Sequence, residues 1–483
     1  MKKYFYHIAF VLALGTLTVA CDDHLDKLNT NPNGPETIDD APLFTKAAHS
    51  LLEYTANTSS FKFGGQYSHS IMCGGTARTA DGYTDGFDGD YNGMASNLMD
   101  NVIRQTTDAL AITAEGDGKN ELRHALISVV EVMAFAKLTD MYGDIPYFEG
   151  GHGKEGNVTP KYDSQADIYD DMVARLASSI DIIQGGNPAN AYPNSDPFFE
   201  NDMDKWARLA NSFRLRLALR MRNADPAKAQ AVIAACLTKP FIETIDQNAT
   251  FDRFETVNPW FDLTYRWPEL KVSTKFLDQL QNTADPRLPA LVAPDTNGGY
   301  RGITNGISDT DFAESDFGSA SNLGDKVIES GSKLYFMTAA EVWFLRAEVA
   351  LLVNEDAAMA NTYFQNGLQA SFDQWDVDGS AFLAGPHGSL AGSPEAMTEQ
   401  IDTQIWVALA PDYLESWFSI RRTGYPVIEQ RTGDMQLGVT NGVLPSRFLY
   451  STLELSTNKT NVEAAIANQG ANKIDTQLWW DKQ

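Results

Sequence analysis

The stretch Glu121–Met141, ELRHALISVVEVMAFAKLTDM, decides the fold class. Its apolar residues recur at steps of three and four, the spacing that places them on one face of an α-helix. Pro226, directly after Asp225, begins a further short helix that is expected to run to about Leu237. Similar helical periodicity covers residues 165–184, 203–223, 338–354 and 356–372. Because long helices follow one another in pairs and strand-like alternation is scarce, the sequence predicts an all-α array of helical hairpins.

Long segments without helical periodicity separate the expected helices. Long ordered loops on a rigid scaffold usually carry function, so we expect these segments to bind a ligand. No clear break in composition follows residue 40, and we therefore expect a single domain over residues 41–483. The irregular segments are 56–93, 185–200, 250–270, 294–333 and 373–398.

Charge and composition exclude several classes of protein. The 483 residues include 37 Lys and Arg against 64 Asp and Glu, a net charge of −27. A nucleic-acid partner is not expected, because binding phosphates requires Lys and Arg. The chain has 3 cysteines, too few for a disulfide framework. Cys73 and Cys236 either pair or remain buried free thiols, and the sequence leaves both readings open.

The N-terminus has the pattern of an export signal. Lys2 and Lys3 precede an apolar stretch over residues 8–20, which is too short to span a bilayer. Small residues directly before Cys21 resemble a bacterial lipobox, which implies that residues 1–20 are removed and that the thiol of Cys21 is lipidated. The alternative is ordinary secretion without lipidation. Residues 21–40 are polar and rich in Asn and Pro, so we expect a lipidated cysteine followed by a flexible leash.

Recognisable catalytic motifs are absent from the sequence. It contains no G-x-S-x-G, H-E-x-x-H, Walker loop or helix-opening G-x-G-x-x-G, and its histidines do not share metal-ligand spacing. A carboxylate pair for glycoside hydrolysis stays open, because sequence does not show how far apart two acids lie. We therefore expect a non-catalytic protein, with a surface glycosidase as one alternative.

One acidic turn resembles the start of a calcium loop. Asp88, Asp90 and Asn92 match the first ligand positions, and Gly93 stands at the sixth. The bidentate acid required at the twelfth position is missing, because that place holds Met99. We consider a weak calcium site, favour a solvated Asp-Gly turn, and expect no cofactor.

Aromatic residues crowd two of the irregular segments. The stretch NPWFDLTYRWP at 258–268 and the Gly- and Asp-rich stretch 81–93 each present several rings. Rings on loops stack on sugar faces while neighbouring polar groups bind hydroxyls, although rings also pin loops to the core. The candidate ligand-binding residues are Tyr83, Phe87, Tyr91, Trp260, Tyr265, Arg266 and Trp267.

Six stretches, in order along the chain, resemble the SusD/RagB family of nutrient-binding outer-membrane lipoproteins, specifically its SusD-like branch. Each stretch alone is modest, but together they cover essentially the whole chain. They are LDKLNTNPN at 25–33, YGDIPY at 142–147, residues 206–222, MTAAEVWFLRAE at 337–348, ESWFSIRRTGYP at 415–426 and WWD at 479–481.

The resemblance implies a tetratricopeptide-like helical fold and a non-catalytic binding function. Members of the family sit on the outer membrane through an N-terminal lipid, with the body facing outward. They capture oligosaccharides, or in some cases peptides, and act as a lid on a SusC-type TonB-dependent transporter. Asp22 and Asp23, directly after Cys21, resemble the surface-export signal of Bacteroidetes lipoproteins.

The motifs that carry the resemblance are mainly scaffold. Residues 142–147 are expected to form a helix-ending turn, and Glu341, Arg346 and Glu348 to form internal ion pairs. Ligand-contacting residues of the family vary, so none is carried over by motif. Three alternatives remain beside oligosaccharide capture: a peptide-binding relative, a surface glycoside hydrolase, and a helical scaffold that binds only protein.

Overall fold

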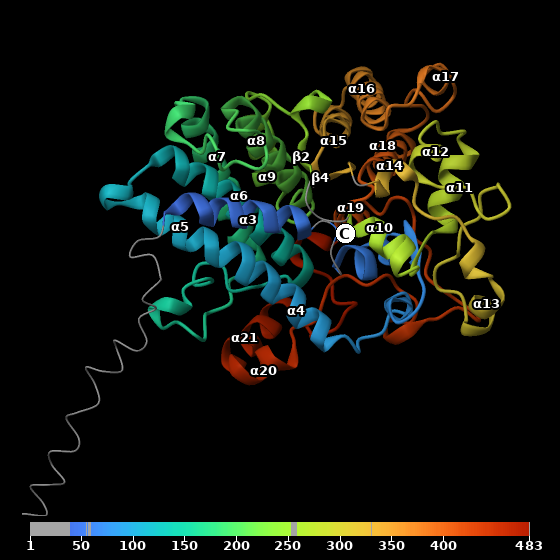
Figure 1. Ribbon diagram of the computed structural model, residues 1–483, viewed down its shortest axis with the longest axis horizontal. Coiled ribbons are helices and arrows are strands. Elements are labelled where there is room, and N and C mark those ends of the chain that lie inside the picture. The colour runs from blue at the N-terminus through green and yellow to red at the C-terminus, as the bar shows by residue number, and fades with distance from the viewer. Residues whose placement is uncertain (1–38, 55, 57–58, 253–257, 330, 483) are drawn as a thin grey trace, which may run out of the picture. The chain divides into compact units, whose positions relative to one another are not determined.

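Long helices that are neighbours in the chain pack side by side in pairs, as Figure 1 shows. The computed structural model describes residues 39–482, apart from residues 55, 57–58, 253–257 and 330. Contacts join α6 to α7, α7 to α8, α8 to α9, α15 to α16 and α18 to α19. The long helices are α3 Asp40–Tyr54, α5 Arg104–Ala114, α6 Glu121–Tyr142, α7 Gln165–Gln184, α8 Met203–Arg220, α9 Pro226–Cys236, α15 Ala339–Leu352, α16 Ala357–Trp375, α18 Pro394–Ala408 and α19 Tyr413–Thr423.

The predicted helical-hairpin array is confirmed, and capping explains where its helices begin and end. The backbone N–H groups of a first helical turn lack partners inside the helix, so an oxygen before the turn stabilises it. The side chain of Asn120 accepts from the N–H of Arg123, and that of Ser164 accepts from the N–H of Asp167. At the other end of α6, Gly143 has φ 86°, a conformation that favours glycine. The stretch 142–147 therefore ends a helix, as expected.

Helix α6 lies at the centre of the array. Every residue from Ala125 to Tyr142 is buried, so α6 is covered on all sides rather than on the single face that its periodicity indicates. It packs against α3, α5, α7 and α8. Three of its buried side chains are charged, and burying a charge is costly unless a partner compensates it. These three are Glu131, Lys137 and Asp140.

A network of buried ion pairs ties α6, α8, α15 and α19 together. Two nitrogens of the Arg216 guanidinium, Nε and Nη2, each donate to Glu341 at 2.6 Å, and the third, Nη1, lies 3.6 Å from Glu415. Arg220 pairs with both Asp140 and Glu415. Burial alone would raise the pKa of Glu415, but Arg216 and Arg220 hold it below its usual value. All five side chains are nearly inaccessible to solvent, so the arginines of α8 stabilise the fold.

The other charges of the motifs also pair internally, as expected. Glu348 accepts two hydrogen bonds from Arg422, at 2.6 and 2.8 Å. Arg346 donates to Glu243 at 2.7 Å and lies over the ring of Trp343.

A second apolar core is built mainly by the short elements between α9 and α15, together with β1 Ile71–Cys73 and residues of α16, α18 and α19. Strands β1 and β3 Leu270–Val272 pair antiparallel, with Met72 opposite Lys271. Strands β2 Ala249–Asp252 and β4 Lys333–Met337 form another antiparallel pair. The short helices are α4 Asp88–Leu98, α10 Pro259–Phe261, α11 Thr274–Asn282, α12 Leu288–Leu291, α13 Asp309–Glu314, α14 Asp325–Ile328, α17 Ser380–Leu383, α20 Thr452–Thr457 and α21 Lys459–Gln469.

Helix α3 begins earlier than the expected end of the leash. Residues Asp40–Gln483 form one compact unit, and Asp40, expected to close the leash, is a buried helical residue that pairs with Arg123 at 2.9 Å. Residues 1–38, which include the predicted signal peptide, Cys21 and nearly all of the leash, lie outside the described residues. Over the described part of the chain, no helix combines the length and apolar character needed to cross a membrane.

The two described cysteines are free and buried, which resolves the alternative that the sequence left open. Cys73 lies in β1 and Cys236 ends α9. Burial raises the pKa of Cys236 to about 11, so its thiol stays protonated and unreactive at neutral pH.

Candidate functional site

Three aromatic rings project into solvent from the loop after α10. Phe261 is 36% exposed, Tyr265 49% and Trp267 66%. The backbone here forms a π-turn, η8 Asp262–Arg266, which the N–H of Trp267 closes by donating to the carbonyl of Asp262 at 2.7 Å. Phe261 and Tyr265 lie one turn apart, with ring centres 5.4 Å from each other. The local fold therefore holds the rings on the surface instead of turning them into the core.

A charged pair accompanies these rings. Arg266 lies 3.2 Å from Asp262, and its side chain is 58% exposed. A guanidinium and a carboxylate beside exposed rings offer both donors and acceptors to a ligand hydroxyl. The predicted residues Tyr265, Arg266 and Trp267 thus lie together in one accessible place.

Trp260 is the exception in this loop, and the prediction that it presents its ring to a ligand is wrong. It is 1% exposed and packs edge-on against Tyr413 of α19, with ring centres 5.3 Å apart. Trp260 and Phe261 are consecutive residues of the single turn of α10, so one side chain points inward and the next outward. Trp260 anchors the loop to the helical body.

A second group of rings, Phe312 and Phe317, is partly buried against a small core, and its segment is linked to the ring-bearing loop through Gly74. The N–H of Gly74 donates to the carbonyl of Glu269 at 2.8 Å, so the segment after β1 lies beside the ring-bearing loop. Phe317 covers Gly74 so closely that a Cβ there would lie 2.9 Å from its ring. Phe312 lies 5.3 Å from Phe317, and the guanidinium of Arg78 lies 4.2 Å from the centre of the Phe312 ring.

We call these residues the ring surface. Arg78 also pairs with Asp309 at the start of α13, which holds its guanidinium at the edge of the group. Sequence reasoning marked segment 294–333 as a long loop but did not single out its rings. The sequence feature that could have indicated them is a pair of phenylalanines, Phe312 and Phe317, five residues apart among Ser, Asp and Gly. The ring surface comprises Phe261, Tyr265, Trp267, Phe312, Phe317 and Arg78.

The rings predicted in stretch 81–93 are buried, which corrects that part of the expectation. Tyr83 is 0% exposed, Phe87 7% and Tyr91 1%. Residues from Asp88 onward form helix α4, and this places Tyr91 on the buried face, stacked on Phe448. Tyr83 lies under the guanidinium of Arg431, 3.5 Å from its ring centre. These rings pin the loop to the core, the alternative that the sequence left open.

The resemblance to a calcium loop does not extend to three dimensions, because the acidic turn is the first turn of α4. Asp88 accepts from the N–H and hydroxyl of Thr452, at 2.6 and 2.7 Å, and Asp90 pairs with Lys62 at 2.6 Å. The amide oxygen of Asn92 accepts from Ser451 at 3.1 Å. In the described part of the chain, no three His, Cys, Asp or Glu residues gather as metal ligands would.

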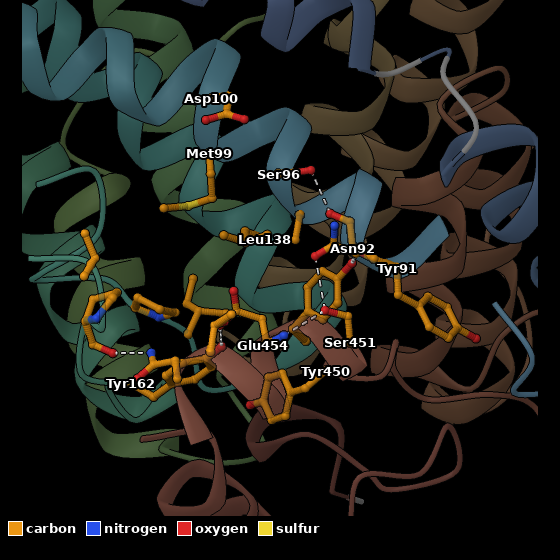
Figure 2. Close-up of a pocket in the computed structure, with 18 residues that line it drawn as sticks. Tyr91, Asn92, Ser96, Met99, Asp100, Leu138, Tyr162, Tyr450, Ser451 and Glu454 are labelled. Atoms are coloured by element: carbon orange, nitrogen blue, oxygen red, sulfur yellow. Dashed lines mark hydrogen bonds between the residues drawn. The ribbon is translucent and has the colours of Figure 1, made fainter. Parts of the chain in front are cut away.

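A cavity of about 260 Å³ lies between α4 and α20, beside the C-terminal end of α6 (Figure 2). It brings together segments far apart in the sequence. Two of its lining residues, Tyr91 and Asn92, come from the stretch that the sequence marked. The others of consequence are Asp100, Tyr142, Tyr162, Tyr450 and Glu454.

One hollow of the helical array is lined by three acids, and neighbouring acids are the arrangement that a glycosidase would need. Glu395 is exposed and accepts a hydrogen bond from the hydroxyl of Tyr425, whereas the other two acids are buried. Asp402 and Glu348 line it together with Arg422. Burial, and then the charge of Glu348, raise the pKa of Asp402 well above its usual range. Each of these two acids is only 1% exposed, and Arg422 binds Glu348 through two hydrogen bonds. These carboxyl groups are therefore built into the scaffold rather than presented to a substrate.

Solved structures with the same fold are numerous, whereas a comparison with curated proteins finds no match. A structure described as a chitin-binding protein is 25% identical, with a TM-score of 0.80, and the match covers 92% of this chain and 100% of that one. A SusD homologue from Bacteroides uniformis is 25% identical, with a TM-score of 0.79, over 93% of this chain and 100% of that one. A chitin-binding SusD homologue from Flavobacterium johnsoniae is 23% identical, with a TM-score of 0.82, over 92% and 99% of the two chains.

The comparison with protein families agrees with the fold and with the sequence motifs. Residues 32–451, most of the chain, match the SusD-like family that is described as starch-binding and associating with the outer membrane. The chain therefore belongs to the SusD-like family.

Proposed function

We propose that the protein is a cell-surface lipoprotein that captures oligosaccharides and delivers them to a SusC-type TonB-dependent transporter. The observation that carries this proposal is the ring surface, where Trp267 is 66% exposed although Trp206, Trp260, Trp406, Trp417 and Trp480 are all fully buried. The description of the family as starch-binding, and of one 25%-identical relative as chitin-binding, supports a glycan as the cargo.

Two kinds of contact, stacking on rings and hydrogen bonds to hydroxyls, would together bind the sugar. The C–H face of a sugar ring packs on an aromatic face, while nearby charged groups bind its hydroxyls. Tyr265 and Trp267 supply exposed faces, and Arg266 and Asp309 supply donors and acceptors at the edges of the ring surface. An open, solvated surface gives moderate affinity, which suits a cargo that must be released to a transporter.

The tether and the transporter complete the proposal. Lipidation of Cys21 would anchor the chain in the outer membrane, and the leash would let the body swing as a lid over the transporter. Replacing Cys21 by Ala should release the protein from the membrane fraction, and proteolysis of intact cells tests whether the body faces outward. Co-purification of the wild-type protein with a TonB-dependent barrel tests the partner.

Calorimetric titration of the purified protein with starch, chitin and other oligosaccharides, and with peptides, tests the cargo. Product analysis of the same mixtures is the matched control for catalysis. Saturable binding of a sugar without cleavage supports the proposal, and binding of peptides alone transfers it to the peptide-binding branch. Cleavage of the sugar would refute a purely binding function.

A further inference from the structure

The cavity in Figure 2 is a second concave site, separate from the ring surface, and no residue is common to both. One side is formed by α4 and by the π-turn η3 Met99–Ile103 that follows it. The other side is formed by residues 158–162 and by α20. Met99 and Asp100 lie across the cavity from Tyr162, Tyr450 and Glu454.

The walls of this cavity offer ring faces and aliphatic groups rather than free hydroxyls. The hydroxyl of Tyr142 donates to the carbonyl of Tyr91 at 2.5 Å, and that of Tyr450 donates to the carbonyl of Asp144 at 2.6 Å. The rings of Tyr162 and Tyr450 meet edge to face, 5.3 Å apart. Because these contacts fix the rings, the cavity does not depend on side-chain rearrangement to stay open.

The charge inside the cavity is negative. Of the described residues that line it, two are acids, Asp100 and Glu454, and none is Lys, Arg or His. Oxygen Oε2 of Glu454 accepts from the hydroxyl of Tyr162 at 2.8 Å, whereas no described residue donates to Oε1. Burial, and then the nearby Glu454 carboxylate, raise the pKa of Tyr162, so its hydroxyl remains a neutral donor.

No described cation forms an ion pair with Glu454, and two cations close to the cavity have other partners. Arg447 lies 4.5 Å from the centre of the Tyr450 ring and donates to the carbonyl of Phe448, without reaching the cavity wall. Arg104 lies 4.0 Å from Asp100 in an exposed pair that water screens. The carboxylate of Glu454 therefore has a tyrosine hydroxyl but no cation as a partner.

We infer that this cavity binds a primary ammonium group carried on a short aliphatic or sugar framework. The free oxygen of Glu454 accepts a charge-assisted hydrogen bond from the ammonium, which is stronger than a bond between neutral groups. Tyrosine faces attract cations, and aliphatic side chains such as Leu138 pack against the carbon framework. An anion is disfavoured, because both acids would repel it.

Two sources share this chemistry, a glycan that carries an unacetylated amino sugar and the side chain of a lysine in a peptide or protein. The cavity volume of about 260 Å³ equals the liquid volume of roughly eight to nine water molecules, which leaves room for an amino sugar or for the end of a lysine side chain. The inference stands apart from the proposed function, because a sugar bound at the ring surface need not carry an amine.

Titration of the purified full-length protein with matched amine and neutral probes tests the inference. D-Glucosamine is compared with N-acetyl-D-glucosamine, and Nα-acetyl-lysine methylamide with its norleucine analogue, which lacks the ammonium. The variant Glu454→Gln removes the charge but retains an oxygen for Tyr162. Glu463→Gln is the control, because Glu463 is an exposed acid of α21 that pairs with Lys459.

We expect an amine probe to bind at least about tenfold more tightly than its neutral partner, and Glu454→Gln to lose about the same factor, as for one hydrogen bond to a charged group. Glu463→Gln should bind like the wild type. Preference for glucosamine assigns the amine to a glycan, and preference for the lysine derivative assigns it to a peptide. Equal binding of amine and neutral probes, unchanged binding by Glu454→Gln, or no saturable binding of either amine would overturn the inference.

Discussion

Replacing Trp267 by Ala should weaken oligosaccharide binding by about 30-fold without destabilising the fold. A Trp side chain has roughly 250 Å² of surface, and at 66% exposure about 165 Å² of it is accessible in Trp267. A sugar ring covers one of its two faces, about 80 Å². At about 25 cal/mol per Å² this contact contributes about 2 kcal/mol, and each 1.4 kcal/mol corresponds to about a tenfold change in Kd.

Trp260 provides a matched comparison seven residues earlier in the same loop. Because Trp260 is buried against Tyr413, Trp260→Ala should lower the free energy of unfolding by about 3–5 kcal/mol through the cavity it leaves. Phe148 is a second control, an exposed ring at 54% that lies outside the ring surface. Phe148→Ala should leave both affinity and stability close to those of the wild type.

The assay is calorimetric titration with the sugar that binds the wild-type protein best, alongside urea unfolding of each variant. The reasoning requires affinity and stability to separate, with Trp267→Ala changing Kd alone and Trp260→Ala changing stability first. If Trp267→Ala bound sugar as tightly as the wild type, or if it lost stability as Trp260→Ala does, the assignment of the ring surface would be refuted.

Three further predictions concern the scaffold. Glu341→Gln removes the charge that Arg216 binds through two hydrogen bonds, and it should lower the free energy of unfolding in urea by about 3 kcal/mol. The control Glu463→Gln, in an exposed ion pair, should lower it by less than about 0.5 kcal/mol. Equal losses in the two variants would contradict a structural role for the buried network. Burial raises the pKa of Asp481 to about 7, so the folded state holds a proton that the unfolded state has lost, and stability should fall as pH rises from about 4 to 7. The variant Asp481→Asn should flatten this dependence of stability on pH. If the dependence persists in the variant, a group other than Asp481 causes it. Removing calcium with EDTA should change neither Tm nor sugar affinity, because Asp88 and Asp90 are bound to Thr452 and Lys62. A fall in Tm on adding EDTA would show that a metal ion does stabilise the protein.

Helical periodicity predicted the scaffold well because the helices repeat their apolar residues over several turns. The expected range 165–184 coincides with α7, and Pro226 begins α9 as proposed. Periodicity did not show that α6 is surrounded on every side, since a fully buried helix still repeats at three and four. That information lies in the helices packed around it, which a local pattern does not contain.

The candidate site was harder to predict because the same ring type serves both roles. Trp260 and Trp267 occupy one loop, and only the turn of α10 and the π-turn η8 decide which is buried. Tyr91 follows Asp and Gly residues that are typical of a turn, yet this stretch starts helix α4. Phe317 packs on Gly74, and Gly74 donates to Glu269, contacts between segments far apart in the sequence that no local pattern reports.

The buried ion pairs also determine when the chain can fold. Lys137 of α6 pairs with Asp412, and Arg220 of α8 pairs with Glu415, partners that lie 275 and 195 positions further along the chain. A growing chain that ended before Asp412 would have to bury charges without compensation, so its N-terminal helices cannot settle into their final core. We therefore expect this core to complete its packing only after the C-terminal segment has been made. Such a delay would leave the chain unfolded for longer, and an unfolded chain is what a narrow translocation channel accepts.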